Sequence, residues 1–222
     1  MARPGIPRGS SHSARRSAAL AFGLALLGAG LAPETSDSAP GTESLATGRF
    51  LVAAEQVHGA FFRQAVVFLV SYGESGALGL IVNHPSDIAL HDVVQGAADG
   101  AGQMYVGGPV ERSSVMVLLR AKSPPDRAMH VTGDIFVTVD PAILLEHTGK
   151  PGAGGDVRVY AGYAGWGAGQ LEAELARGDW IVASEALEPV IFADAPDELW
   201  KRLHLRHHRL RVQAPAVQRF RS

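Results

Sequence analysis

Short apolar runs, each closed by a glycine- or proline-containing turn, recur along most of the chain and constrain its fold more than any other feature. In QAVVFLVSY (64–72), β-branched and aliphatic residues follow one another without alternation, as in a strand buried on both faces. The turn GESG (73–76) leads into ALGLIVN (77–83), and two such runs joined by a short glycine-containing loop predict a β-hairpin. Pro85 is expected to end the second strand.

Other runs of this kind predict a sheet of many short strands, at residues 49–54, 104–110, 114–120, 129–140, 156–166 and 179–184. The expected helices are few and short, at residues 91–98, 141–148, 167–177 and 196–203. Asp140 and Pro141 suit a helix start, because Asp is a favoured N-cap and Pro is favoured at the first helical position. Strands that outnumber scattered short helices predict an α+β fold with mostly antiparallel pairing.

Composition limits the domain count and the chemistry. The chain has 222 residues, of which 46% are hydrophobic, so we expect a single compact domain with a full core. It contains no cysteine, which excludes disulfides, zinc-thiolate sites and thiol nucleophiles. The formal net charge of −2 gives no sign of a nucleic-acid-binding body.

The N-terminal region has the pattern of an export signal. Residues 1–16 contain arginines and no acidic residue, and residues 17–32 are apolar and uncharged. A basic segment before a short apolar run predicts a signal peptide-like leader over 1–32, and the run falls short of the ~20 residues of a membrane-spanning helix. A polar, disordered linker is expected over 33–47. The mature domain is then expected to be periplasmic or otherwise exported, with no membrane span. A membrane anchor and a cytoplasmic protein with a spurious leader are the alternatives.

The glycine-rich stretch AGYAGWGAGQL (161–171) lacks the residues of a phosphate or nucleophile site. A P-loop would place Lys and Ser or Thr where Gln170 and Leu171 stand, the glycine spacing does not match a dinucleotide fingerprint, and no serine lies between the glycines of a nucleophile elbow. We interpret the stretch as a tight corner before a helix, with a ligand site as the alternative. Tyr163 and Trp166 would cover the corner, and Gln170 would bond to its backbone.

A hydrolase site is the enzymatic alternative. Ser113 and Ser114 could act with one of the histidines His58, His84 or His130, but the sequence shows no Ser-His-Asp arrangement. No cofactor motif is present, so no cofactor is expected.

The C-terminal segment is strongly basic. Residues 201–222 hold seven Lys and Arg residues and no acidic residue. His204 and His208 would share a helix face, but the surrounding positive charge opposes a dication, and no metal site is expected. We interpret 204–222 as a solvated basic tail; binding of acidic partners, anionic lipid or nucleic acid is the alternative.

Three motifs in a fixed order resemble the YqgE/AlgH family of bacterial proteins. They are GAxGLxxNxP (76–85), VGGP (106–109) and GYAGWxxGQLExE (162–174), within a similarity that spans residues 48–203. His84 departs from the Lys or Arg usual at that position, and the leader and the basic tail are additions to the usual family pattern.

This resemblance implies a compact α+β domain with a barrel-like sheet and helices packed outside. Members of the family are mostly cytoplasmic, and their biochemical function is not established. The family's name is tied to transcriptional regulation of exopolysaccharide synthesis, but no DNA-binding motif and no accepted catalytic residues come with it.

The function that we expect is binding or regulation without catalysis. Loops at strand ends could converge on one rim, whose residues are Asn83, Gly107, Gly108, Tyr163, Trp166 and Gln170. The expected partner is an unknown protein or small molecule, and nucleic acid is expected only through the basic tail. Transcriptional regulation, direct or indirect, and hydrolysis at an unrecognised site are the alternatives.

Overall fold

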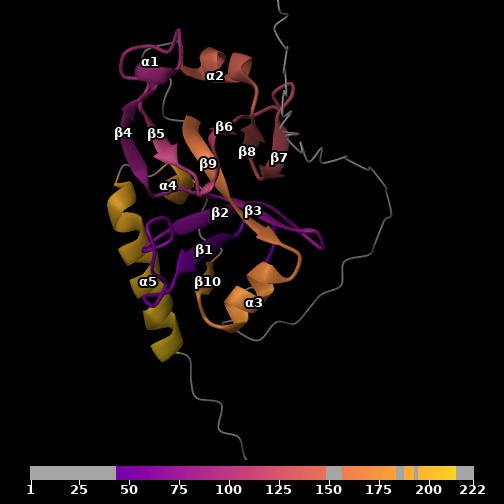
Figure 1. Cartoon of the computed structure of the whole chain (residues 1–222), viewed down its shortest axis with the longest axis vertical. Coiled ribbons are helices and arrows are strands. Elements are labelled where there is room, and N and C mark those ends of the chain that lie inside the picture. The colour runs from indigo at the N-terminus through magenta and orange to yellow at the C-terminus, as the bar shows by residue number, and fades with distance from the viewer. Residues whose placement is uncertain (1–43, 149–156, 184–187, 193–194, 214–222) are drawn as a thin grey trace, which may run out of the picture. The chain divides into compact units, whose positions relative to one another are not determined.

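A computed structural model describes residues 44–148, 157–183, 188–192 and 195–213, all within one compact unit, Ser38–Ser222 (Figure 1). The predicted leader and most of the predicted linker lie outside the described residues. Among these residues, no helix is long and apolar enough to cross a membrane. The expected α+β fold, with a mostly antiparallel, barrel-like sheet, is confirmed.

The described strands are β1 (Phe50–Ala53), β2 (Val66–Gly73), β3 (Gly76–Ile81), β4 (Pro85–Ala89), β5 (Gln103–Val106), β6 (Val110–Arg120), β7 (Met129–Thr132), β8 (Ile135–Thr138), β9 (Val157–Gly167) and β10 (Trp180–Ala183). The described helices are α1 (Leu90–Val93), α2 (Pro141–Thr148), α3 (Gln170–Ala176), α4 (Glu188–Ile191) and α5 (Pro196–Gln213).

The strands form a curved half-barrel sheet in the order β10-β1-β2-β3-β9-β6-β8-β7, and β5 joins it through β9. The predicted β2–β3 hairpin is present, with Gly73 opposite Gly76. Every described strand pair is antiparallel except β5 with β9. Strands β2–β3 and β7–β8 form local hairpins, whereas β1–β10, β3–β9 and β6–β9 join strands that are far apart in the sequence.

Strand β9 is the centre of the sheet because it changes neighbour along its length. Its first half pairs with β5, with Val106 opposite Ala161, and its second half pairs with β3, with Ala77 opposite Trp166. Strand β6 lies along its other edge (Figure 1). The change of neighbour needs a close approach of several chain segments, and the glycine motifs lie at this place.

Strand β2 is buried on both faces, as its unbroken apolar run predicts. Val66, Phe68 and Val70 belong to one hydrophobic cluster, and Val67 and Leu69 belong to a second one on the opposite face. A third cluster lies around β6, β9 and α2. Side chains alternate across a strand, so each face of β2 packs against a different layer of the core.

Two boundaries differ from the sequence-based expectation. Pro85 follows β3, as expected, but it is also the first residue of β4, a short edge strand that pairs with β5. Proline is tolerated at this position because an edge strand does not need every backbone N–H for pairing. Helix α5 runs on through Gln213, so residues 204–213 of the predicted tail are helical. The helix continues because Leu203 and His204 are still buried against the domain and no Gly or Pro interrupts it.

Candidate functional site

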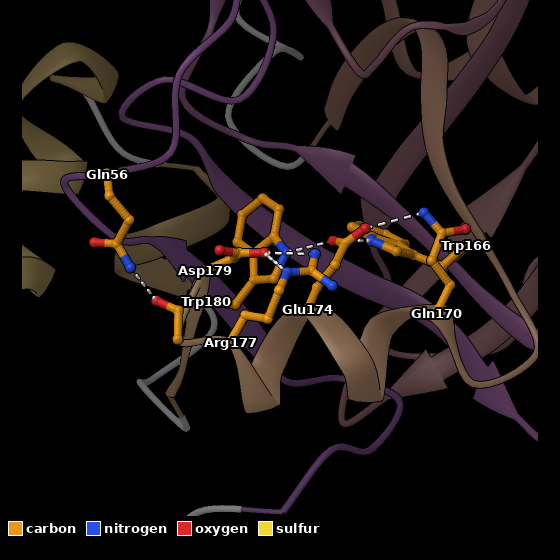
Figure 2. A network of polar contacts seen from close by, with 8 residues as sticks. Gln56, Trp166, Gln170, Glu174, Arg177, Asp179 and Trp180 are labelled. Carbon is orange, nitrogen blue, oxygen red and sulfur yellow. Dashed lines mark hydrogen bonds and ion pairs between the residues drawn. The ribbon is translucent and has the colours of Figure 1, made fainter.

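The carboxylate of Glu174, on α3, lies at the centre of the GYAGWxxGQLExE motif. The indole N–H groups of Trp166 and Trp180 both donate to its Oε2, at 2.9 and 2.8 Å, and Gln170 Nε2 donates to its Oε1 at 2.9 Å (Figure 2). The two indole rings meet edge to face, with centroids 6.0 Å apart. One carboxylate thus ties α3 to β9 and to β10.

These contacts also set the charge state of Glu174. Partial burial favours the neutral carboxyl, but the hydrogen bonds from Trp180, Gln170 and Trp166 and the positive charge of Arg177 outweigh it, so the pKa of Glu174 lies below its ordinary value. The side chain is therefore ionised at neutral pH. Sequence reasoning does not reveal this role of Glu174, because its carboxylate turns towards two tryptophans that no sequence spacing connects.

The other polar residues of the motif are also used within the fold. Gln170 Oε1 accepts the backbone N–H of Gly167 at 3.1 Å, which confirms the bond to the turn that the sequence predicts. Glu172 accepts a 2.7 Å hydrogen bond from the hydroxyl of Tyr72 on β2. This bond raises the pKa of Tyr72 and lowers the pKa of Glu172. The motif therefore attaches helix α3 to the sheet. We call the hydrogen bonds of Glu174 with Trp166, Gln170 and Trp180 the Glu174 fastener.

The glycines of the VGGP and GYAGW motifs pack directly on one another. A Cβ on Gly107 would lie 2.2 Å from the carbonyl oxygen of Gly162, and a Cβ on Gly108 would lie 2.2 Å from the carbonyl carbon of Tyr163. Gly162 itself has φ +69°. The backbone N–H of Gly107 donates to Ala161 O at 2.9 Å. These glycines allow two backbones to touch where β9 exchanges β5 for β3, which leaves no room for a phosphate cradle.

The structure does not bring the six predicted rim residues together. Trp166 and Gln170 belong to the Glu174 fastener, and Gly107, Gly108 and Tyr163 form the backbone contact at the middle of β9 (the full set is Asn83, Gly107, Gly108, Tyr163, Trp166 and Gln170). Asn83 follows the far end of β3, whereas Trp166 lies opposite Ala77 near its start.

Asn83 is 3% exposed, and its side chain holds the loop before β2. Its Oδ1 accepts the backbone N–H of Val66 at 2.7 Å, and its Nδ2 donates to the carbonyl oxygen of Gln64 at 2.9 Å. Gln64 has φ +57°, a left-handed conformation that is costly for a residue with a side chain. The buried amide of Asn83 therefore supports a strained residue at the surface.

Beside this strained residue lies an open pocket of about 550 Å³, the candidate functional site. We call it the Asn83 pocket; its lining residues are Gly59, Ala60, Arg63, Gln64, Asn83, His84 and Asp197. The first four come from the loop between β1 and β2, the next two follow β3, and Asp197 lies in the first turn of α5. Sequence reasoning found Asn83 and His84 as candidates but missed Arg63 and Asp197, because no spacing connects a loop with a helix 130 or more residues later.

The imidazole of His84 is half-buried in this pocket. Burial lowers its pKa, and the charge of Asp197 and a hydrogen bond to the backbone of Gln64 offset only part of that effect, so the pKa stays below its ordinary value. At neutral pH the ring is uncharged. His84 therefore does not supply the fixed cation that Lys or Arg would supply at this position.

Two residues of the predicted hydrolase site, Ser114 and His130, have hydrogen-bond partners other than each other. Ser114 Oγ donates to Glu111 Oε2 at 3.2 Å, and His130 Nε2 lies 2.9 Å from the carbonyl oxygen of Gly133. Neither residue lines the Asn83 pocket, and no serine does. Within the described ranges, no group of three or more His, Cys, Asp and Glu side chains could hold a metal ion.

Comparisons with known proteins agree with the motif resemblance. A model of the AlgH-like family (DUF179) matches residues 50–209. A UPF0301 protein of Mycobacteroides abscessus is 38% identical over 179 residues, covering 74% of this chain and 81% of that protein. The UPF0301 protein Rv0038 of Mycobacterium tuberculosis is 34% identical over 173 residues, covering 73% of this chain and 82% of that protein.

Two solved structures have a similar fold. The crystal structure of protein DIP2367 from Corynebacterium diphtheriae superposes with a TM-score of 0.61 at 25% identity, covering 74% of this chain and 88% of that one. The solution structure of the AlgH protein from Pseudomonas aeruginosa gives a TM-score of 0.59 at 28% identity, covering 79% of this chain and 97% of that one. The family model covers well over half of the chain and the fold agrees with both structures: this protein belongs to the AlgH-like family.

Proposed function

We propose that this protein is a non-enzymatic binding or regulatory protein and that the Asn83 pocket is its ligand site. The observation that carries the proposal is that some polar residues are used in contacts within the fold, whereas others line an open pocket. The residues of the 106–109 and 162–174 motifs are used in the glycine contact and the Glu174 fastener, whereas Asn83 and His84 of the 76–85 motif join Arg63 and Asp197 around an open pocket of about 550 Å³. This volume lies within the range of small-molecule sites.

Backbone strain at the pocket supports the same site. Gln64 is held with φ +57° by the buried amide of Asn83. Non-glycine residues in this conformation cost of order 1–3 kcal/mol each and gather at functional sites. A strained residue that a buried side chain maintains therefore favours a functional role for the surface beside it.

The test is ligand-induced stabilisation across a defined panel of amino acids, short peptides, nucleotides, sugars and organic acids. A ligand at 100 times its Kd stabilises the folded state by about 2.7 kcal/mol, a rise in Tm of roughly 5–10 °C for a chain of this size. We expect at least one class to stabilise the wild type and Ala60→Phe, which fills the pocket from an exposed position, to abolish the effect. Val93→Phe, at an exposed site outside the pocket, is the control. No stabilisation by any class, or stabilisation that Ala60→Phe leaves intact, would refute the proposal.

Nucleic-acid binding is the second candidate, and α5 is the feature that favours it. The exposed side chains of Lys201, Arg202, Arg206 and Arg209 follow one another along this helix. Binding through such contacts would weaken steeply with salt, since each phosphate contact releases counterions. A titration of double-stranded DNA at 50 and 200 mM salt distinguishes this candidate from the pocket, because Ala60→Phe would not alter it.

We also propose that the domain acts after export. Only the sequence supports this, through the basic and apolar segments of residues 1–32. Removal of the leader would change the formal net charge from −2 to −6. An exported protein would act on transcription only indirectly.

A further inference from the structure

Two opposite charges line the Asn83 pocket without pairing with each other. Arg63 comes from the loop between β1 and β2, and Asp197 comes from the first turn of α5. In the described part of the chain, neither side chain forms an ion pair. A ligand that carried a negative group and a positive group could satisfy both.

Uncharged hydrogen-bonding groups extend this pattern. Asn83 lines the pocket, and its Nδ2 carries two hydrogens, of which one is used on Gln64 O. The uncharged ring of His84 has one nitrogen bonded to the backbone of Gln64, and its other nitrogen is an acceptor. The pocket thus offers the amide donor of Asn83 and the cation of Arg63 to a negative group. It offers the acceptor nitrogen of His84 and the anion of Asp197 to a positive group.

This balance argues against the other common classes of small ligand. A nucleotide would bring two or more negative charges to one arginine, and Asp197 would repel them. A sugar carries no charge, so it would pair with neither Arg63 nor Asp197. An apolar ligand would find few apolar side chains among the lining residues.

We propose that the Asn83 pocket binds a zwitterion of the amino acid or short-peptide class, with Arg63 and Asn83 holding its carboxylate and Asp197 and His84 holding its ammonium group. The proposal rests on the proposed binding function and adds the chemical class of the ligand. At about 550 Å³ the pocket has room for more than a single small amino acid, which favours a short peptide with both ends free.

The test is a calorimetric titration of the full chain with alanine, L-alanyl-L-alanine and tri-L-alanine. We expect one of the three to bind. N-acetylation, which removes the ammonium group, and C-terminal amidation, which removes the carboxylate, should each weaken it at least tenfold. The three lengths distinguish a free amino acid from a peptide as the source of the zwitterion.

Variants assign each end of the ligand to a side chain. Asp197→Asn should weaken the free peptide at least tenfold but leave the binding of its N-acetylated form unchanged, because that form has no ammonium group to lose. Arg63→Gln should weaken the free peptide at least tenfold but leave the binding of its amidated form unchanged, because that form has no carboxylate to lose. The controls are Asp99→Asn and Lys122→Gln, both at exposed positions outside the pocket. Circular dichroism verifies that each variant is folded.

The proposal is overturned if none of the three compounds binds, if capping either end has no effect, or if the variants weaken the free and capped forms equally. If a nucleotide or sugar of the panel binds and Ala60→Phe abolishes that binding, the pocket is a ligand site of another class. In that outcome the zwitterion is excluded while the proposed function stands.

Discussion

At the scale of single residues, the structure explains most of the family motif by contacts inside the domain. Glu174 accepts hydrogen bonds from two indoles and one amide. Gly162 has no side chain, which leaves room for the backbone carbonyl groups of Gly108 and Val110. Such residues are required by the fold whether or not a ligand exists. The 106–109 and 162–174 motifs are therefore evidence of a demanding backbone path, whereas the end of the 76–85 motif, Asn83 and His84, lines the pocket.

Glu174→Gln should destabilise the domain. If the amide oxygen stays with the two indoles, they keep only an uncharged acceptor and the new N–H group faces the Nε2 donor of Gln170; if the amide turns round, both buried indoles lose their acceptor. An unsatisfied buried donor costs about 1–3 kcal/mol. Urea unfolding, followed by tryptophan fluorescence, measures the change. Glu146→Gln, at an exposed position of α2 outside the motif, should stay within about 0.5 kcal/mol, and equal effects of the two variants would contradict the fastener.

The effect of Glu174→Gln should also depend on pH. The pKa of Glu174 is lower in the folded protein than its ordinary value of 4.5, so its ionised form contributes stability above that pH and loses it as pH falls through the folded-state value. The difference in unfolding free energy between wild type and Glu174→Gln should therefore shrink as pH is lowered from 7 to below 4. A difference that stayed constant over this interval would show that the charge of Glu174 is not involved.

Gly162→Ala should destabilise the domain far more than Gly169→Ala. The two glycines have nearly the same φ, +69° and +72°, so the left-handed backbone costs both variants about 1–2 kcal/mol. Only at Gly162 would the new Cβ meet backbone, with Val110 O at 2.7 Å and Gly108 O at 2.8 Å; at Gly169 it would meet nothing within 4 Å. We expect about 1–3 kcal/mol of additional loss at Gly162 from unfolding curves. Equal losses would mean that the close approach does not matter.

At the scale of helices and strands, the sequence predicts whether a segment is a helix or a strand better than it predicts where the segment begins and ends. The apolar run of β2 and the Asp140–Pro141 helix start are both confirmed: Asp140 Oδ1 accepts the N–H of Ala142 at 2.8 Å. The sequence did not predict β4, because Pro85 and Asp87 are of types that are depleted in strands and β4 pairs only with β5 among the described strands. Long-range pairing, which no local pattern encodes, decides such short edge strands.

Helix α5 is expected to depend on one face for its attachment. Leu203 is 5% exposed, whereas Leu205 on the same helix is 44% exposed. Leu203→Ala should cost about 2–5 kcal/mol through the cavity that it leaves, and Leu205→Ala should stay within about 0.5 kcal/mol, since alanine is an equally good helix former. Chemical unfolding of both variants is the measurement. A large effect of Leu205→Ala would indicate that the outer face of α5 is packed in solution.

At the scale of the whole molecule, family and fold could be predicted from the sequence, but the candidate site could not. The order of the glycine motifs indicated the half-barrel domain. The Asn83 pocket gathers Ala60, Arg63, Asn83 and Asp197 from three separate parts of the chain. Their proximity results from the folding of the sheet and the return of α5, so no spacing in the sequence could reveal it.

Export makes a separate prediction about the mature chain. If residues 1–32 are a cleaved leader, mass spectrometry of the protein from fractionated cells of the native host should find an N-terminus between Pro33 and Gly48 in the periplasmic fraction. An intact N-terminus in the cytoplasmic fraction would contradict export. That outcome would leave the ligand site untouched, because residues 1–32 include none of the pocket residues.

The central claim is that residues 162–174 hold the fold together and that the Asn83 pocket binds the ligand. The most direct test is a map of the amide chemical-shift changes that a ligand causes. ¹⁵N-labelled protein would be titrated with the panel compound that stabilises it most, and the perturbed amides assigned. We predict changes at residues 59–64, 83, 84 and 197, and little change at residues 162–174. Changes centred on residues 162–174 would show that the glycine motif itself binds the ligand and would contradict the separation of the two roles.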